Sequence, residues 1–386
     1  MTAALPTIAE LVARRQPGHA LERAFYERPD IFERDLDILL GGWTCVGHVS
    51  EVAAPGDWLV AELGSESAIV ARGDDGVLRA MANVCRHRGS RICVEARGSA
   101  AAFTCPYHAW SYRLDGSLRA AREMPEGFAP KDHGLKRLPL AMVGGLILIS
   151  FGDDPPSLAA AAPALAAMTD DHGWEGATVA RRATWPVAAN WKLAMENYHE
   201  CYHCAPAHPE FAALHALARP GARRVRAGDV EIWPRETDGR ELVRTMRSTL
   251  AAGRSTGSAT GALVAPLMRD GDEGACVFAE LGYLSAFLAY ADHGIVYRFV
   301  PRGVLETDME VIWLVRGDAA AGRDYDPAAL GWLWETTTLA DKTIIERNQA
   351  GVSSRAYVPG PYSTMEPGTA QYIDRYLADL ALAAGP

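Results

Sequence analysis

Two short stretches, Cys85-Arg86-His87 and Cys105-Pro106-Tyr107-His108, carry most of the information about the fold of this chain. Each places one cysteine and one histidine a few residues apart, so each can form a tight loop that offers a thiolate and an imidazole to a metal. Together the two loops can give two sulfur ligands to one iron and two nitrogen ligands to another. That ligand set is typical of a two-iron, two-sulfur cluster with mixed ligation.

A structural zinc site is the main alternative, because it too is built from cysteine and histidine. Zinc modules usually place both cysteines in one knuckle and both histidines in another, whereas here each loop holds one of each. Gly89 and Pro106 also supply the irregular backbone that points ligands and N–H groups toward a cluster. The sequence therefore resembles the Rieske family. The expected ligands of its [2Fe–2S] cluster are Cys85, His87, Cys105 and His108.

The composition describes an ordinary globular protein with length for two domains. The chain has 386 residues, of which 49% are hydrophobic and 22% charged, and its net charge of -10 argues against nucleic acid or an anionic membrane as a partner. Seven cysteines, an odd number with uneven spacing, argue against a secreted disulfide framework. The apolar runs at 141–151 and 159–168 are far shorter than the roughly 20 residues that span a bilayer. No signal peptide is evident, and we expect a cytoplasmic protein.

The patterns along the chain predict three parts and an α+β fold class. Residues 1–40 show helical spacing of apolar residues, with Asp30 as the expected N-cap of one helix. Residues 41–152 contain short strands broken by glycines, including 58–60, 68–70 and 146–149, and the two Cys–His loops lie within this small all-β domain. Residues 153–386 alternate helical blocks with strands, which indicates a larger α+β domain.

A second group of ligand-type residues lies between Asn190 and His208. Asn190 is expected to cap a helix that continues until Pro206 interrupts it. Within it, His199 to His203 formally match the H-E-x-x-H helix of zinc proteases, but the extended form of that motif has a glycine and a histidine where this chain has prolines. A second interpretation takes Cys201-x-x-Cys204 as a redox pair, although the sequence lacks the surrounding β-α-β pattern.

A third interpretation takes His203 and His208 together with a distant carboxylate. Two histidines and one carboxylate form the binding face of non-haem Fe(II) oxygenases and leave positions for O2 and substrate. Glu200, His203 and His208 resemble the E-x-x-H-x(4)-H pattern of Rieske non-haem iron oxygenases, and Asn190-Trp191-Lys192 also belongs to that family. Gly89 and Tyr107 stand where respiratory Rieske proteins carry extra cysteines, which favours the oxygenase branch.

Asp341 is the expected carboxylate ligand. Asp326-Pro327 is a helix-start signal, and Asp341 falls on the apolar stripe of the helix that follows. A carboxylate there is either a metal ligand or a buried, hydrogen-bonded aspartate. The resemblance favours the ligand, because the family pattern continues through residues 341–362. It is matched by Asp341, Gln349, Gly351, Ser354, Ala356, Tyr357, Gly360 and Tyr362.

The resemblance also implies an architecture and an electron path. It implies a catalytic domain with an antiparallel sheet and helices of helix-grip type, and a homotrimer in which the cluster of one subunit feeds the mononuclear iron of its neighbour. Glu200 would bridge a cluster histidine, His87 or His108, to His203. Because no G-x-G-x-x-G occurs, we expect the electrons to come from NAD(P)H through a separate flavin and iron–sulfur reductase.

The C-terminal third resembles the branch that oxidises betaines, including glycine betaine, choline, carnitine and stachydrine. Monooxygenation of an N-methyl carbon would then give N-demethylation with release of formaldehyde. Aromatic faces bind quaternary ammonium groups. The candidates are Trp233, Phe278, Tyr283, Phe287 and Tyr290. The alternatives are an oxygenase that hydroxylates aromatic rings or removes O-methyl groups and, more remotely, a Rieske electron carrier.

Overall fold

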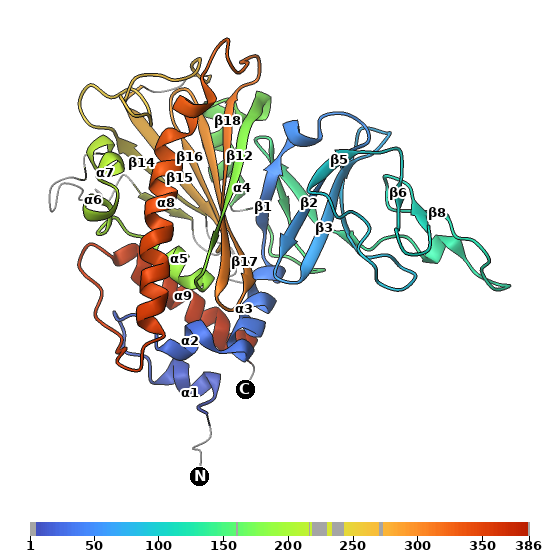
Figure 1. Ribbon diagram of the computed structural model, residues 1–386, viewed down its shortest axis with the longest axis horizontal. Coiled ribbons are helices and arrows are strands. Elements are labelled where there is room, and N and C mark those ends of the chain that lie inside the picture. Colours follow the sequence, from blue (N-terminus) through green and yellow to red (C-terminus); the bar gives the residue numbers. More distant parts are fainter. Residues whose placement is uncertain are drawn as a thin grey trace.

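The computed structural model describes residues 5–159, 161–215, 217, 230–233, 243–269 and 273–384 (Figure 1). In this part of the chain a group of small β-sheets, at the right of the view, adjoins a larger sheet that is covered by helices. This arrangement confirms the expected α+β fold class. The expected division of the chain at residues 40 and 152 stays a prediction.

The N-terminal helices pack beside the helices of the larger part. They are α1 (Ile8–Ala13), α2 (Arg23–Glu27) and α3 (Pro29–Gly41). The prediction that Asp30 caps a helix is wrong, because α3 begins at Pro29, whose missing N–H and fixed φ suit the first helical position. Asp30 instead accepts a hydrogen bond of 2.9 Å from Nε of Arg28. The buried ion pair between Asp35 of α3 and Lys192 joins this segment to the larger part.

The small part consists of three antiparallel sheets, and both Cys–His loops project from them. The strand orders are β5-β2-β3-β4-β9, β1-β11-β10 and β6-β7-β8. The elements are β1 (Thr44–His48), η1 (Val49–Val52), β2 (Asp57–Leu63), β3 (Glu66–Arg72), β4 (Leu78–Ala82), β5 (Arg97–Ser99), β6 (Phe103–Thr104), β7 (Ser111–Tyr112), β8 (Leu118–Ala120), η2 (Pro130–Asp132), β9 (Arg137–Leu138), β10 (Leu140–Val143) and β11 (Leu146–Ile149). The strands expected at 58–60, 68–70 and 146–149 are confirmed. The first Cys–His loop follows β4, and the second joins β6 to β7.

The larger part is built on a seven-stranded antiparallel sheet of order β12-β18-β17-β16-β15-β14-β13. Its strands are β12 (Ala177–Val187), β13 (Val230–Trp233), β14 (Val243–Thr249), β15 (Ala275–Leu281), β16 (Ser285–Ala289), β17 (Gly294–Gly303) and β18 (Glu306–Arg316). Its helices are α4 (Ala162–Asp171), η3 (Trp174–Gly176), α5 (Trp191–Tyr198), α6 (Cys204–Ala207), α7 (Pro209–Leu214), α8 (Pro327–Val352) and α9 (Pro367–Ala383). Among the described helices, none is long and apolar enough to cross a membrane.

Helices cover both faces of this sheet, which explains why its central strands are apolar at nearly every position. On β17, Tyr297 and Phe299 face the core shared with α5, α8 and α9. The intervening Val296 faces a second core shared with α4 and strand β1. The long helix α8 runs across the first face (Figure 1). This helix carries Asp341 over the sheet, where α6 and α7 also lie.

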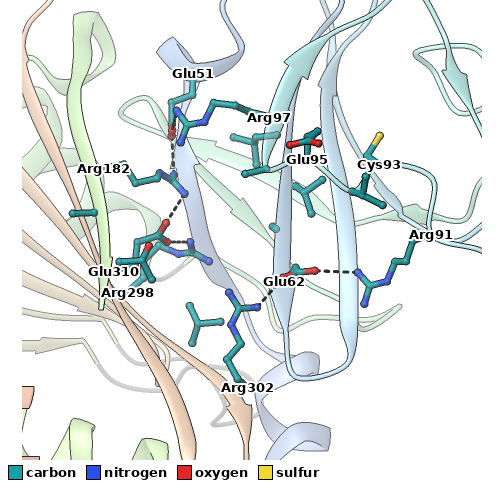
Figure 2. A pocket seen from close by; sticks show the side chains of 18 residues that line it. Glu51, Glu62, Arg91, Cys93, Glu95, Arg97, Arg182, Arg298, Arg302 and Glu310 are labelled. Carbon is teal, nitrogen blue, oxygen red and sulfur yellow. Dashed lines mark hydrogen bonds and ion pairs between the residues drawn. The ribbon is translucent and has the colours of Figure 1, made fainter. Parts of the chain in front are cut away.

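A buried ionic network joins the two parts (Figure 2). Arg182 of β12 lies between Glu51 of η1 and Glu310 of β18, at 2.9 Å from a carboxylate oxygen of each. Glu310 also pairs with Arg298 of β17. Burial raises the pKa of Glu310, but the two guanidinium groups outweigh burial and hold that pKa below its usual range. These residues line a pocket of about 550 Å³ between β2 and β17. Because buried charges need their partners, the network holds the two parts in one orientation.

Candidate metal centres

The two Cys–His loops have the same backbone. In each, the N–H four residues after the cysteine donates to the cysteine carbonyl, from Gly89 at 2.9 Å and from Ala109 at 3.0 Å. In each, the cysteine N–H donates to the carbonyl of the residue five positions later, which is Ser90 at 2.9 Å in the first loop and Trp110 at 2.8 Å in the second. Gly89 and Ala109 both have positive φ, 79° and 59°. This conformation costs an alanine about 1–2 kcal/mol, so the surrounding contacts must hold the second loop.

The candidate cluster ligands differ in exposure. Cys85 and Cys105 are buried, whereas His87 and His108 are exposed, with ring centroids 4.6 Å apart. Burial raises the pKa of Cys105, but hydrogen bonds from nearby backbone N–H groups and from Cys85 outweigh it and lower that pKa. A lowered pKa favours the thiolate, which is the form that binds iron. The loops therefore fit a [2Fe–2S] cluster bound by two cysteines and two histidines.

The second candidate site lies where the chain passes from α6 to α7 beside α8. His203 and His208 flank α6, and Asp341 lies midway along α8. Oδ1 of Asp341 is 3.2 Å from Nε2 of His203 and 3.1 Å from Nε2 of His208. Neighbouring ligand atoms on a metal with bonds of about 2.1 Å lie about 3 Å apart. The structure thus brings together the three side chains that the motif and the helical periodicity selected.

The polar atoms of this site lack the partners that buried atoms need. Oδ1 of Asp341 and both ring nitrogens of His208 are buried and have no aligned hydrogen-bond partner in the described part of the chain. Burial raises the pKa of Asp341, but the imidazoles of His203 and His208 outweigh it and lower that pKa, so the carboxylate is ionised. A buried carboxylate beside the unpartnered imidazole of His208 is costly unless a cation joins them. The donor set fits a divalent metal of the non-haem iron type.

Glu200 holds the ring of His203 from the side opposite Asp341. One carboxylate oxygen of Glu200 contacts Nδ1 of His203, and the other accepts from the backbone N–H of His203 at 3.1 Å. The contact at Nδ1 assigns the ring proton to that nitrogen and leaves Nε2 for a metal. Burial lowers the pKa of His203, but the carboxylates of Asp341 and Glu200 raise it to about 10. An imidazole between two carboxylates marks a site with excess negative charge, which favours a cation.

The expected helix from Asn190 to Pro206 is wrong in its length. Asn190 does cap α5, because its side chain accepts from the N–H of Lys192, but α5 ends at Tyr198. The Glu200 carboxylate accepts from the N–H groups of Tyr202 and His203, so a local side-chain bond replaces the next helical turn. Glu200 therefore reaches His203 through a turn, not along a helix face.

The zinc-protease interpretation fails on the position of His199. Its Nδ1 lies 2.7 Å from the carbonyl oxygen of Met195, and its Nε2 lies 3.3 Å from the carboxylate of Glu280. Its ring packs on Tyr372 at a centroid distance of 4.2 Å. His199 is therefore a partnered core histidine, and it forms no metal pair with His203.

Cys201 and Cys204, which lie beside His203, are free thiols. The sulfur of Cys204 lies within 4.8 Å of donor atoms of His203 and His208, which makes it an alternative to Asp341 as the third donor. A hydrogen bond with Cys201, together with burial, raises the pKa of Cys204 far above its usual range. A neutral thiol is a poor metal ligand. The ionised Asp341 is therefore the stronger candidate.

Aromatic side chains continue from this site into the core. Phe211 of α7 lies 5.4 Å from His208 and 5.8 Å from Trp334 between ring centroids. Phe211 also packs on His215 at 4.2 Å. Phe211, His215 and Trp334 were not among the predicted site residues. For Phe211 and His215 the available signal was spacing, because they follow His208 by three and seven residues, as on one helix face.

The five aromatic residues that were expected near the substrate lie in different parts of the structure. Phe278 and Tyr290 lie 5.8 Å and 6.0 Å from the ring of His215, so they border this aromatic group. Phe287 packs in the core on the opposite face of the sheet, and Tyr283 packs beside α9, so the expectation for these two is wrong. The side chain of Trp233 lies outside the described residues.

The two candidate centres of one chain are far apart. Strand β6 leads into the second Cys–His loop, and α6 joins His203 to His208. Figure 1 shows these two elements at opposite ends of the longest axis of the molecule. A cluster in the loops and a metal beside α6 would therefore not be neighbours within one chain.

Comparison with known proteins agrees with both centres. The Rieske [2Fe-2S] domain family matches residues 42–139, and the family of ring hydroxylating alpha subunits (catalytic domain) matches residues 174–381. The glycine betaine monooxygenase oxygenase subunit of Chromohalobacter salexigens is 34% identical over 97% of this chain and 89% of its own length. The corresponding subunit of Pseudomonas aeruginosa is 35% identical over 95% of this chain and 90% of its own length. The carnitine monooxygenase oxygenase subunit of Acinetobacter baumannii is 34% identical over 49% and 53%.

Solved structures share the fold. A quaternary ammonium Rieske monooxygenase matches with a TM-score of 0.75 at 23% identity, covering 98% of this chain and 99% of that one. Naphthalene 1,2-dioxygenase from Rhodococcus sp. matches with a TM-score of 0.69 at 18% identity, covering 95% of each chain. From the near full-length relatives and the two family matches, we conclude that the chain belongs to the Rieske non-haem iron oxygenases, as an alpha (oxygenase) subunit with a Rieske [2Fe–2S] cluster and a mononuclear iron.

Proposed function

We propose that this oxygenase uses O2 and electrons from a separate reductase to hydroxylate an N-methyl group of a betaine-type quaternary ammonium compound. The observation that carries the proposal is the match along nearly the whole chain, at 34% and 35% identity, to two glycine betaine monooxygenase oxygenase subunits. Hydroxylation of an N-methyl carbon gives a carbinolamine, which collapses to formaldehyde and the demethylated amine. The reaction is therefore measured as N-demethylation.

The proposal assigns a role to each set of donors. The cluster ligands are Cys85, His87, Cys105 and His108, and the ligands of the mononuclear Fe(II) are His203, His208 and Asp341. When bound, the mononuclear iron activates O2 with electrons that the cluster supplies. Asp341 provides the negative charge and closes the ligand face from α8. Glu200 fixes the tautomer and the orientation of His203 through Nδ1.

We further infer a homotrimer in which the cluster of one subunit lies beside the mononuclear site of the next. The separation of β6 from α6 within one chain supports this arrangement, because electron transfer needs a short path (Figure 1). Glu200 is placed to complete that path. Its carboxylate contacts His203, and its side chain remains 11% exposed, so it is accessible to a cluster histidine, His87 or His108, of a neighbouring subunit.

The aromatic group beside His208 supports a cationic substrate. A quaternary ammonium group gains about 0.5–2 kcal/mol from an aromatic face within roughly 6 Å. Phe211 borders His208, and Trp334 packs on Phe211, so these two rings are the aromatic groups that we place beside the metal. We assign these two residues, rather than Phe287 or Tyr283, to the substrate pocket.

A second candidate function is oxidation of an aromatic substrate by the same two centres. The observation that favours it is a match to the large oxygenase component of salicylate 5-hydroxylase from Ralstonia sp., which is 34% identical over 51% of this chain. The carrier alternative explains neither the second donor set nor the catalytic-domain match at residues 174–381.

The test measures O2 uptake and formaldehyde release, with a chemically reduced surrogate donor, against a panel of betaines and aromatic compounds. The proposal predicts that turnover of a betaine consumes O2 and releases formaldehyde in equal amounts. The Asp341→Asn variant should give neither. Turnover of an aromatic compound without formaldehyde, and no turnover of any betaine, would contradict the proposal.

A further inference from the structure

A marked charge asymmetry surrounds the cluster loops. Residues 84–122 contain seven arginines and two acidic residues, although the whole chain has a net charge of -10, and the segment 123–133 adds Lys131 and three acidic residues, Glu123, Glu126 and Asp132. Five of these arginines are exposed and form no ion pair in the described part of the chain. They are Arg86, Arg88, Arg113, Arg119 and Arg122. A basic patch on an acidic protein attracts a negatively charged partner and speeds its association.

Three of the five arginines belong to the hairpin that covers the cluster loops. Arg113 follows β7, Arg119 lies on β8, and Arg122 follows β8. The Tyr112 hydroxyl of this hairpin lies 3.3 Å from the sulfur of Cys85 and accepts from the N–H of Arg86 at 3.0 Å. The hairpin therefore packs against the cluster site, and its three arginines are exposed.

An aromatic group connects this hairpin to one cluster ligand. Trp110 is 3% exposed and stacks on His87, with 4.9 Å between ring centroids and 9° between ring planes. Phe128 and His133, from the segment after the hairpin, lie 5.6 Å and 6.0 Å from Trp110 and are both partly exposed. Packed rings thus lead from the protein surface to His87.

The other cluster histidine has different surroundings. His108 packs on Tyr107 at a centroid distance of 3.8 Å, and Tyr107 is 54% exposed. The guanidinium of Arg88 lies 5.2 Å from the centroid of Tyr107. His87 is therefore backed by the buried ring of Trp110, whereas His108 packs on the exposed ring of Tyr107. The cluster can receive an electron on one side and pass it on from the other.

We propose that Arg113, Arg119 and Arg122, over the Trp110–His87 stack, form the docking surface for an acidic electron-donor domain. The proposal deepens the proposed function and rests on it only in requiring a separate reductase. In each encounter the donor loses one electron, and one of the two cluster irons goes from ferric to ferrous. Two such encounters supply the two electrons that, with two protons and one O2, balance a monooxygenation with release of one water.

Charge complementarity favours the donor as the occupant of this face. Steering by opposite charges raises association rates from about 10⁵–10⁶ to as much as 10⁸–10⁹ M⁻¹s⁻¹ at low salt, and screening removes the gain. A donor that must bind, deliver one electron and leave needs fast association more than a large buried area. The exposed rings of His108 and Tyr107 remain available for a neighbouring subunit.

The test compares two double charge reversals. Arg119→Glu/Arg122→Glu changes the proposed face, and Arg316→Glu/Arg323→Glu makes the same charge change on the catalytic domain. Cluster reduction is followed by stopped-flow absorbance without O2 or substrate. The donors are the flavin and iron–sulfur reductase of a glycine betaine monooxygenase system and the small cation methyl viologen, chemically reduced. Reductase binding is measured separately by hydrogen exchange over residues 110–133.

We expect the first variant to be reduced by the reductase at least tenfold more slowly than wild type at low salt, with a flatter salt dependence. Its reduction by methyl viologen should stay fast, and the control variant should behave as wild type with both donors. Reductase should protect residues 110–133 in wild type and in the control variant, but not in the first variant. Equal reduction of both variants by the reductase would overturn the proposal. Dissociation of the first variant's oligomer on sedimentation would also overturn it, because the face would then be a contact between copies. Since neither substrate nor mononuclear iron takes part, a wrong substrate assignment would leave these results unchanged.

Discussion

His203 is the residue at which the two proposed roles of the second site meet. Its Nε2 faces Asp341 at 3.2 Å, and its Nδ1 contacts Glu200. One imidazole ring therefore joins a candidate metal ligand to a carboxylate that remains partly exposed. Changes at Glu200 and at Asp341 should consequently have different effects, since of these two residues we propose only Asp341 as a metal ligand.

Replacing Glu200 with glutamine should keep both metal centres and a reducible cluster but lower turnover by about 10–100-fold or more. The reason is that the amide removes the charge that orients His203 and that, in the proposed assembly, would link it to a cluster histidine. Metal analysis, cluster reduction and formaldehyde release measure the three properties. Glu210→Gln, an exposed change on α7, is the control. Wild-type turnover in Glu200→Gln would remove Glu200 from the mechanism.

Replacing Asp341 with asparagine should remove the mononuclear iron alone. The amide has nearly the same shape but lacks the charge that balances a divalent cation beside two imidazoles. Iron should fall from about three to about two atoms per chain, with about two acid-labile sulfides retained. Cys85→Ser should show the reverse pattern, with the sulfide lost. Retention of the third iron in Asp341→Asn would return Cys204 as the candidate ligand.

At the scale of elements, the network between η1, β12, β17 and β18 determines how the two parts meet. Glu310→Gln should destabilise the protein by about 3–5 kcal/mol, because it leaves Arg182 and Arg298 buried without their shared charge. Urea unfolding measures this loss. Asp318→Asn, which breaks the exposed pair with Arg316, should cost less than about 1 kcal/mol. An equal effect of both changes would contradict a structural role for the network.

Wild type and the Glu310→Gln variant can also be compared as a function of pH. The pKa of Glu310 is lowered in the folded state, so its charge stabilises the fold in full above the unfolded-state pKa of about 4.3. That contribution is lost as the pH falls through the lower, folded-state pKa. The difference in unfolding free energy between wild type and Glu310→Gln should therefore be constant from pH 7 to 5 and shrink below about pH 4. A difference that shrinks between pH 7 and 5 would point to another group.

The ends of the helices show which structural features could be predicted from the sequence and which could not. Asn190 and Asp326 were predicted as caps and do accept from the N–H groups two residues on, because capping depends on local chemistry. The end of α5 was missed, because it depends on a bond from the Glu200 side chain that competes with the helix. The position of Phe287 was also missed. Which face of a strand borders the metal depends on the packing of α4 and α8, and periodicity alone does not give it.

The candidate site could be predicted to a similar extent. The Cys–His loops, His203 and His208 follow from residue type and spacing, and Asp341 follows from helical periodicity over a long, regular helix. That α8 would bring Asp341 within 3.2 Å of both histidines depends on long-range packing. The aromatic residues Phe211 and Trp334 come from different elements, so no local pattern joins them.

In the molecule as a whole, one chain holds two distant candidate centres (Figure 1). The small sheets carry the loops that fit the electron-supplying cluster, and the helices over the large sheet carry the donors that fit a catalytic iron. Their positions at opposite ends of the longest axis make an assembly necessary for a short electron path (Figure 1). The separation of roles therefore predicts that one subunit can use the cluster of another.

Complementation between two inactive variants tests this claim most directly. Cys85→Ser should lack the cluster, and Asp341→Asn should lack the mononuclear iron, so each alone should release no formaldehyde from a betaine. The two chains are co-expressed with different tags, and the mixed oligomers are purified through both tags. The account predicts that the mixed oligomers regain a substantial fraction of wild-type formaldehyde release, because an intact cluster then lies beside an intact iron site of the neighbouring chain. Mixed oligomers that contain both chains, with both metals loaded, and still release no formaldehyde would contradict it.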